Sequence, residues 1–213
     1  EGEGLLGLCN FPNFTSPKTR EWWEKMMKSY TDIGIKGFWN DMNEIATWGQ
    51  KLPDNIEFEF EGEGGTTRKG RNIYGMQMAR SAFESAKANL DNKRPFNLTR
   101  AGFAGVQRYS ALWTGDNVAN DDNMMLGIRM VNSLGLSGVA FSGYDVGGFA
   151  GNGQSGLFAR WIQAGACSPC YRGNSTINSN ASERWAYGEV VEVDSINYNN
   201  LNYKLLIYIY NVF

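Results

Sequence analysis

The sequence predicts an α/β fold in which βα units surround a parallel sheet. Short apolar runs, each followed by an amphipathic stretch, repeat along the chain and are typical of strands that alternate with helices. The chain has 213 residues, slightly fewer than the roughly 250 of a closed (β/α)₈ barrel. Its 26 glycines and 14% aromatic residues favour a compact, loop-rich enzyme over a helical bundle. No shift in composition marks a boundary, so we expect one incomplete domain.

The predicted strands are short apolar runs at residues 34–39, 94–100, 110–113, 138–142 and 167–171. The predicted helices have apolar residues three or four positions apart and span residues 17–33, 73–90, 121–134, 157–166 and 188–212. Ser16, before Pro17, is the expected N-cap of the first helix, and Ser155 is the expected cap of the fourth. Residues 50–71 are rich in glycine and charge, and we expect them to form a long loop over a site.

Histidine is absent from the sequence. Its absence excludes Ser-His-Asp and Cys-His catalysis, histidine-ligated metals and an imidazole pH switch. Acid–base chemistry therefore falls to carboxylates, Lys, Tyr or Cys. Twenty Lys and Arg against 22 Asp and Glu give a formal net charge of −2, so we expect no nucleic-acid partner. No apolar run approaches 18 residues, so we expect no membrane partner.

Both ends of the sequence resemble segments from the middle of a longer chain. The chain begins with Glu1 in a Gly-rich stretch, without an initiator Met, and stops at Phe213 within an apolar helical pattern. We therefore expect a piece of a longer protein, whose targeting signal and compartment the sequence does not give. The oligomeric state is not predicted either. An incomplete barrel leaves sheet edges and core exposed, so we expect this piece alone to be poorly soluble and inactive.

The chain has three cysteines, Cys9, Cys167 and Cys170, which is an odd number and too few for a disulfide framework. The spacing of Cys167 and Cys170 is that of a redox pair or of half a zinc site. A zinc site needs four ligands, and without histidine the set cannot be completed from N and S donors. We therefore expect these cysteines to be ordinary buried apolar residues, and we expect no metal and no cofactor.

Three predicted strands lead into an aspartate, namely Asp41, Asp116 and Asp145. In a parallel barrel all strands point the same way, so these carboxylates would gather on the carboxyl-terminal face, where barrel active sites lie. Arg100 ends a fourth strand and would reach the same rim. The alternative is that each aspartate only caps the helix after its strand.

Two tryptophans, Trp39 and Trp113, lie beside these acids in the sequence. Flat indole faces suit stacking on the apolar faces of sugar rings. Glycoside hydrolysis needs one carboxylate as nucleophile or base and one carboxylic acid as proton donor. Clustered carboxylates with arginine and tryptophan, and without histidine, therefore indicate a glycoside hydrolase.

Five motifs carry a resemblance to a known family and span residues Gly37–Glu44, Leu98–Arg100, Gln107–Tyr109, Trp113–Asn117 and Asp145–Phe149. In this order they resemble glycoside hydrolase family 31, the α-glucosidase and α-xylosidase family. The resemblance covers almost the whole chain. It implies a partial (β/α)₈ TIM barrel, about strands 4 to 8 of the catalytic domain, with the N-terminal and C-terminal β-domains absent. It also implies a retaining α-glycosidase that acts on terminal α-linked glucosyl or related residues of an oligosaccharide or α-glucoside.

The resemblance assigns roles that the residues alone leave open. Asp41 matches the nucleophile that forms a covalent glycosyl-enzyme intermediate, and Asp116 matches the general acid/base. Glu44 is expected behind the nucleophile, where it orders the loop. The residues expected to contact the sugar are Trp39, Met42, Arg100, Trp113, Asp145, Phe149 and Asn174. The family contains hydrolases, transglycosylases and lyases, and the motifs do not separate them.

The sequence departs from the family pattern at Asn174. The family usually carries a histidine at the end of an R-N-H or R-G-H triplet, which reads Arg172-Gly173-Asn174 in this chain. Asparagine donates a neutral hydrogen bond but carries no charge, and loss of such a contact costs about 1–3 kcal/mol. Weakened activity, altered specificity and sequence decay are all consistent with this change.

Two other functions are compatible with parts of the sequence. One is a non-catalytic or impaired homologue that still binds carbohydrate. The other is a dinucleotide-binding oxidoreductase, because residues Gly151–Gly156 match G-x-G-x-x-G between a predicted strand and a helix. No acidic residue follows at the end of a strand about 20 residues on, where the ribose would be held.

Overall fold

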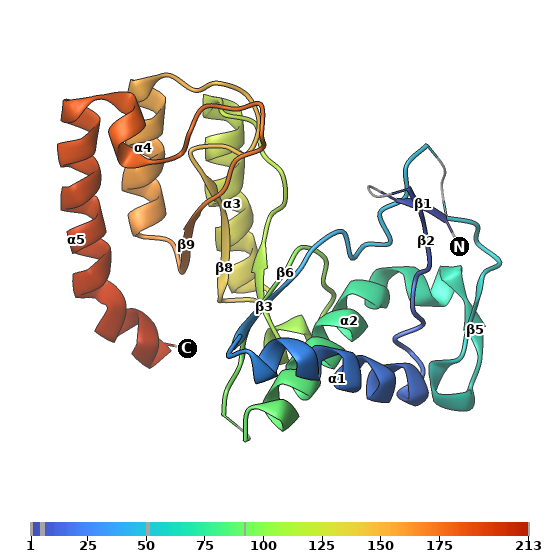
Figure 1. Cartoon of the computed structure of the whole chain (residues 1–213). Helices are drawn as coiled ribbons and strands as arrows, with labels where there is room; N and C mark the ends of the chain where they lie inside the picture. The colour runs from blue at the N-terminus through green and yellow to red at the C-terminus, as the bar shows by residue number, and fades with distance from the viewer. Residues whose placement is uncertain (1, 5–6, 50–51, 92, 213) are drawn as a thin grey trace. The chain divides into compact units, whose positions relative to one another are not determined.

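The computed structural model describes residues 2–4, 7–49, 52–91 and 93–212. The chain divides into two compact units, Glu1–Leu112 and Trp113–Phe213. Figure 1 shows the helices and strands of both units, coloured along the chain.

The first unit consists, in chain order, of β1 (Gly2–Gly4), β2 (Gly7–Cys9), α1 (Pro17–Asp32), β3 (Gly37–Asn40), β4 (Glu57–Phe58), the 3₁₀ helix η1 (Phe60–Gly62), β5 (Gly65–Thr66), α2 (Thr67–Asn89), β6 (Phe96–Thr99), η2 (Val106–Arg108) and β7 (Ala111–Trp113). The second unit begins within β7 and continues with α3 (Asp121–Leu136), β8 (Ser142–Val146), α4 (Ser155–Ala166), β9 (Cys170–Gly173), η3 (Arg184–Tyr187) and α5 (Glu189–Val212).

The central strands are parallel. In the first unit β3 pairs with β6, with Asn40 opposite Thr99, and β6 pairs with β7. In the second unit β8 pairs with β9 along its length. The hydrogen-bonded strand order is β3-β6-β7-β8-β9. This order confirms the predicted α/β class and the succession of βα units.

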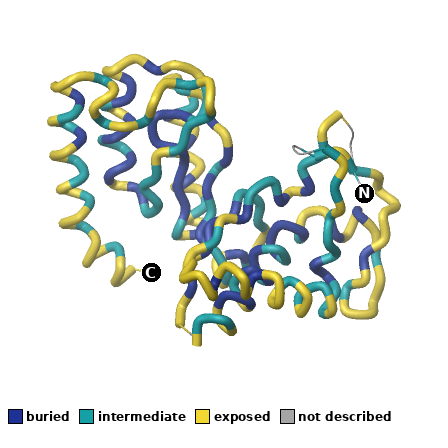
Figure 2. Tube along the Cα trace, in the orientation of Figure 1, coloured by how far each residue is buried: buried dark blue, intermediate teal, exposed yellow. Residues whose placement is uncertain are grey.

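The core of the first unit lies where α1 and α2 pack together beside the strands (Figure 2). Phe14, Phe58 and Tyr74 form an aromatic cluster, with Tyr74 5.6 Å from Phe14 and 6.4 Å from Phe58 between ring centroids. A second cluster joins Met27 of α1 to Ala82 of α2. Small residues on α2 therefore allow the two helices to approach each other closely.

The core of the second unit is built from α3, α4 and β8. Trp161 and Phe158 of α4 pack with Tyr144 and Val146 of β8 and with Met124 of α3. Helix α3 begins at a capped N-terminus, because the side chain of Asn120 accepts a hydrogen bond from the Asn123 N–H. These contacts fix β8, the strand that carries Asp145.

The fourth predicted strand, residues 138–142, is misplaced. Gly138 has φ +83° and the Val139 N–H donates to the Leu134 carbonyl, which is the glycine-based end of a helix. These residues terminate α3, and β8 begins only at Ser142. Asp145 therefore lies inside the strand and not after its end.

Several other boundaries also differ from the prediction. The predicted loop at 50–71 contains the β4–β5 hairpin, η1 and the start of α2 at Thr67; residues 50 and 51 lie outside the described residues. Ser155 is the first residue of α4, and Gln154 precedes it as the N-cap. Ser16 is the N-cap of α1 by backbone conformation, but its side chain makes no capping hydrogen bond.

The prediction that all three cysteines are buried is wrong. Cys167 is exposed, while Cys9 and Cys170 are half-buried, and all three are free thiols. Cys167 follows the last residue of α4 and its N–H caps that helix. A turn at the surface therefore places this thiol in solvent.

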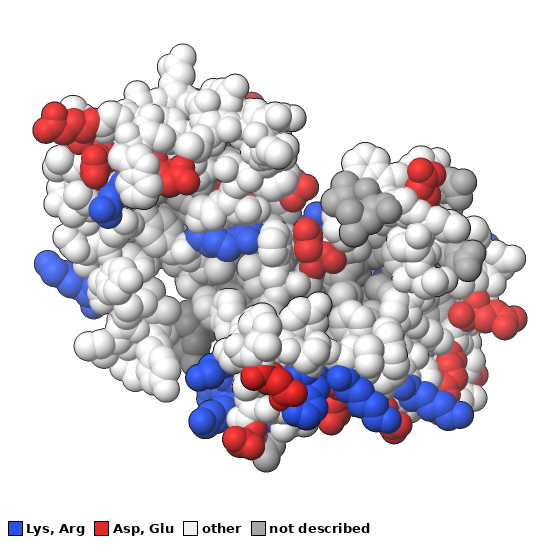
Figure 3. All heavy atoms as spheres, viewed as in Figure 1, with Lys and Arg blue, Asp and Glu red and all other residues white. Residues whose placement is uncertain are grey.

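Charged side chains of both signs lie close together on the face shown in Figure 3, for example along α1. One such pair is Lys28 and Asp32, one helical turn apart. In the described part of the chain, no helix is long and apolar enough to cross a membrane.

We expect Gly143→Ala to disrupt the pairing of β8 with β9. A Cβ at this position would overlap the Cys170 backbone carbonyl and lie 2.7 Å from the Cys170 Cβ. Neither backbone can yield without breaking the ladder, so the variant should lose about 1–3 kcal/mol or more. A lower midpoint of thermal unfolding of the full-length protein measures this loss.

Gly156→Ala is the matched control, because nothing lies within 4 Å of a Cβ built at this position in α4. It should be neutral, or stabilising by up to about 1 kcal/mol. Equal midpoints for the two variants would contradict the close approach of β8 and β9 at Gly143.

Candidate functional site

Asp41 directly follows β3, where the chain turns sharply. Met42 has φ +56° and Ile45 has φ +68°, both in the left-handed region. Residues other than glycine seldom adopt this conformation, and those that do are often found in strained loops at functional sites. The Met42 N–H donates to the Asp41 carboxylate at 2.8 Å. The turn thus orients this carboxylate through its own backbone.

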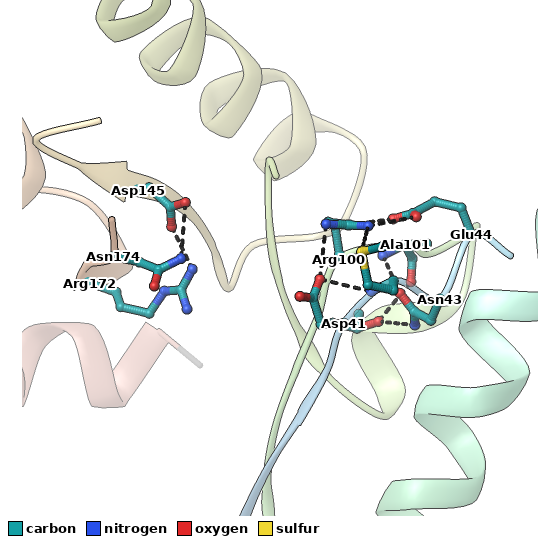
Figure 4. A network of polar contacts seen from close by, with 10 residues as sticks. Asp41, Asn43, Glu44, Arg100, Ala101, Asp145, Arg172 and Asn174 are labelled. Carbon is teal, nitrogen blue, oxygen red and sulfur yellow. Dashed lines mark hydrogen bonds and ion pairs between the residues drawn. The ribbon is translucent and has the colours of Figure 1, made fainter. Parts of the chain in front are cut away.

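Arg100 directly follows β6, the neighbouring strand, and contacts three side chains of this loop (Figure 4). Its Nη1 lies 3.1 Å from Asp41 Oδ1. Its Nε and Nη2 donate to the two carboxylate oxygens of Glu44 at 2.7 and 3.1 Å, and Nη2 also contacts the Met42 sulfur. A two-point arginine–carboxylate contact fixes orientation as well as charge, so Glu44 holds Arg100 in place against Asp41.

Asp145 is the most buried carboxylate of the candidate set, with no exposed surface. It lies in β8 opposite Arg172 of β9. The Arg172 Nη2 donates to Asp145 Oδ1 at 2.5 Å, and the Asn174 amide donates to Oδ2 at 3.5 Å. Burial raises the pKa of the Asp145 carboxyl to about 6, although Arg172 and Asn174 oppose the rise, and nearby Asp116 adds to it.

Arg172 was not among the predicted site residues. The Arg172 guanidinium also lies over the indole of Trp113, 5.1 Å from the ring centroid. Trp113 exposes only 1% of its surface, whereas Trp39 of β3 exposes 51%. The register of β8 against β9, which sequence spacing does not reveal, is what brings Arg172 to Asp145.

Asn117 connects the segment after β7 to the end of β8. Its side-chain amide donates to the Asp145 backbone carbonyl at 3.0 Å, and its side-chain oxygen accepts from the Phe149 N–H at 2.8 Å. Asp116, the residue before it, is exposed. One buried asparagine therefore ties the segment of Asp116 to Asp145 and Phe149.

The predicted residues thus fall into two groups, one in each unit. The loop after β3 and the end of β6 bring together Asp41, Met42, Glu44 and Arg100. The second unit brings together Trp113, Asp145, Phe149 and Asn174, with Asp116 next to Asn117. Among the described residues, no three His, Cys, Asp or Glu side chains are grouped so that they could hold a metal ion.

Comparison with protein families gives a match over residues 2–212 to the model described as the TIM-barrel domain of glycosyl hydrolases family 31. The chain belongs to this family. The expected partial (β/α)₈ barrel is therefore confirmed by both the match and the parallel sheet.

Relatives within family 31 include alpha-glucosidase 2 of Bacillus thermoamyloliquefaciens, which is 42% identical over 100% of this chain and 27% of its own length. A solved family 31 alpha-glucosidase from Bacteroides thetaiotaomicron superposes with a TM-score of 0.85, at 38% identity over 99% of this chain and 34% of its own. The glucosidase II alpha subunit in its DNJ-bound form superposes with a TM-score of 0.86, at 32% identity over 96% of this chain and 23% of its own. The chain thus spans between about a quarter and a third of these family 31 proteins.

We expect Arg172→Met to destabilise the full-length protein more at pH 7.5 than at pH 5. Because the pKa of the Asp145 carboxyl is raised to about 6, the folded state keeps its proton between about pH 4 and pH 6, a range in which the unfolded state has lost it. Stability from this group therefore falls as pH rises through that window. At pH 5 the Asp145 carboxyl of the folded state is mostly neutral and is stabilised little by Arg172. At pH 7.5 it is ionised, so removal of Arg172 leaves a buried charge without its ion-pair partner.

The difference between the two pH values should be at least about 1–2 kcal/mol, since one pKa unit corresponds to about 1.4 kcal/mol. Thermal unfolding midpoints at both pH values measure it. Arg160→Met, which removes an exposed ion pair with Asp121, is the control and should show no such pH dependence. An equal loss for Arg172→Met at pH 5 and pH 7.5 would mean that Asp145 does not titrate in this range.

Proposed function

We propose that the protein containing this chain is a retaining α-glycosidase, with Asp41 as nucleophile and Asp116 as general acid/base. The observation that carries the proposal is the Asp41 carboxylate, which follows β3 and is held by Arg100 at 3.1 Å and by the Met42 N–H at 2.8 Å. Enzymes with a (β/α)₈ barrel place their reacting groups at the carboxyl ends of the barrel strands. Family membership adds support through the names of the relatives.

In the proposed reaction Asp41 attacks the anomeric carbon of the substrate. Asp116 gives its proton to the departing glycosidic oxygen, and the carbon–oxygen bond to the leaving group breaks. Asp116 then removes a proton from water, which attacks the same carbon and releases Asp41. Arg100, held by Glu44, prevents the Asp41 carboxylate from rotating away from the sugar.

The proposed substrate is an oligosaccharide or α-glucoside with a terminal α-linked glucosyl or related residue. Asp145 offers a buried carboxylate as acceptor for sugar hydroxyls, and Asn174 offers an amide beside it. Trp39 presents an exposed indole on which a sugar ring can stack. Asn174 takes the place where the family usually has histidine, so we expect a neutral contact with the sugar there.

We also propose that the chain corresponds to about strands 4 to 8 of the catalytic barrel, and that the β-domains of the enzyme lie elsewhere in the longer protein. The five parallel strands and the family match over residues 2–212 support this assignment. Completion of the barrel would supply the remaining strands and the rest of the sugar site.

Asp41→Asn and Asp116→Asn should each abolish turnover of an unactivated α-glucoside by the full-length protein, with kcat lower by about 10⁴-fold or more. Azide should restore cleavage in the Asp41 variant and give a β-glycosyl azide, because azide takes the place of the missing carboxylate. With the Asp116 variant any azide product should be the α-anomer, since azide then attacks the glycosyl-enzyme. Product configuration by NMR measures both outcomes.

Asp121→Asn is a suitable control, because Asp121 forms an exposed ion pair at the start of α3, and it should retain wild-type kcat. Wild-type activity of Asp116→Asn would disprove the role of Asp116. Ligand binding without any turnover by the wild-type protein would instead favour an impaired carbohydrate-binding homologue.

A further inference from the structure

Asn43 lies in the turn that carries Asp41, and its side chain is hydrogen-bonded at both its nitrogen and its oxygen. The residue exposes 2% of its surface. Its amide donates to the Gly75 carbonyl of α2 at 3.3 Å and to the Thr99 hydroxyl at 2.7 Å, and its side-chain oxygen accepts from the Ala101 N–H at 3.0 Å. Both amide hydrogens and the oxygen are therefore used inside the protein.

Thr99 completes this connection from the other strand. It is the last residue of β6, directly before Arg100, and is completely buried. Its hydroxyl accepts from Asn43 and donates to the Ala101 carbonyl at 2.8 Å. The turn of Asp41 is thus hydrogen-bonded, through Asn43, to the residues on both sides of Arg100, Thr99 and Ala101.

Helix α2 closes behind this junction. A Cβ at Gly75 would lie 2.6 Å from the Ala101 Cβ and 2.9 Å from the Ala101 carbonyl oxygen. The helix backbone therefore packs directly against the turn that holds Arg100. Asn43 is attached to both of these backbones and has little freedom to shift.

The turn of Asp41 needs such an attachment, because Met42 and Ile45 on either side of Asn43 hold positive φ angles. Such conformations persist only where surrounding contacts impose them. Asp41 contacts the Arg100 guanidinium across this junction. A change in the junction would therefore move the carboxylate relative to the arginine without removing either group.

We propose that Asn43 and Thr99 form a buried polar clamp that positions Asp41 against Arg100 for attack on the sugar. Both are positioning residues and neither touches the substrate. The proposal rests on the proposed role of Asp41 as nucleophile. It adds that the reaction rate depends on two buried groups behind the site.

The test compares Thr99→Val with Thr15→Val in the full-length protein. Thr15 is also buried in the first unit, and its hydroxyl likewise donates one hydrogen bond, to Asn13, and accepts one, from the Phe60 N–H. The two substitutions thus remove the same chemical group from two buried sites. Readouts are kcat and KM for an aryl α-glucoside, with the thermal unfolding midpoint of each variant.

We expect Thr99→Val to lower kcat by about 10- to 100-fold, the scale of a misplacement near 1 Å, with KM changed by less than about threefold. Thr15→Val should lower the unfolding midpoint to a similar degree and leave kcat unchanged. Thr99→Ser keeps the hydroxyl and should restore most of the lost kcat. Asn43→Asp, which cannot donate to Thr99 or Gly75 when ionised, should lower kcat in the same way.

Wild-type kcat in folded Thr99→Val, or an equal loss of kcat in Thr15→Val, would overturn the clamp. Asp41→Asn in the same series separates this failure from failure of the proposed function. An inactive Asp41 variant with a fully active Thr99→Val would reject the clamp alone, whereas an active Asp41 variant would reject the nucleophile.

Discussion

The contact of the Arg100 guanidinium with Asp41 and Glu44 is the interaction on which the candidate site of the first unit depends. One cation meets two carboxylates and a methionine sulfur, all from a single turn after β3. Without the arginine, two acidic side chains three residues apart would repel each other and the turn would lose its partner. The parallel pairing of β3 with β6 makes the contact possible, because Asn40 and Thr99 lie opposite each other at the ends of the strands.

The second unit shows the same principle with a more deeply buried carboxylate. Asp145 and Arg172 lie opposite each other in adjacent strands, and Arg172 in turn lies over Trp113. Burial of an isolated carboxylate is strongly unfavourable unless it is paired and hydrogen-bonded, and here arginine and asparagine provide both. In each unit, therefore, an arginine–carboxylate pair holds an acidic side chain of the candidate site.

The sequence was sufficient for the fold class and for most elements, because apolar periodicity and strand–helix alternation are local properties. The same reasoning placed a strand at residues 138–142, because Val139 and Phe141 resemble a buried strand. The structure uses Gly138 and Val139 to end α3 instead. Asp145, Arg172 and Asn174 then meet through strand register, which depends on distant parts of the chain. The arrangement of Asn43 with Thr99, 56 residues apart, could not be predicted for the same reason.

The proposed mechanism requires a covalent bond between Asp41 and the sugar. It is tested most directly by incubating the full-length protein with 5-fluoro-α-glucosyl fluoride, which forms a slowly hydrolysed glycosyl-enzyme, followed by tryptic digestion and tandem mass spectrometry. We expect a fluoroglucosyl mass increment on the peptide of residues 37–51, located at Asp41 and not at Glu44. A stable label on Glu44, or on Asp116 in the peptide of residues 109–129, would contradict it.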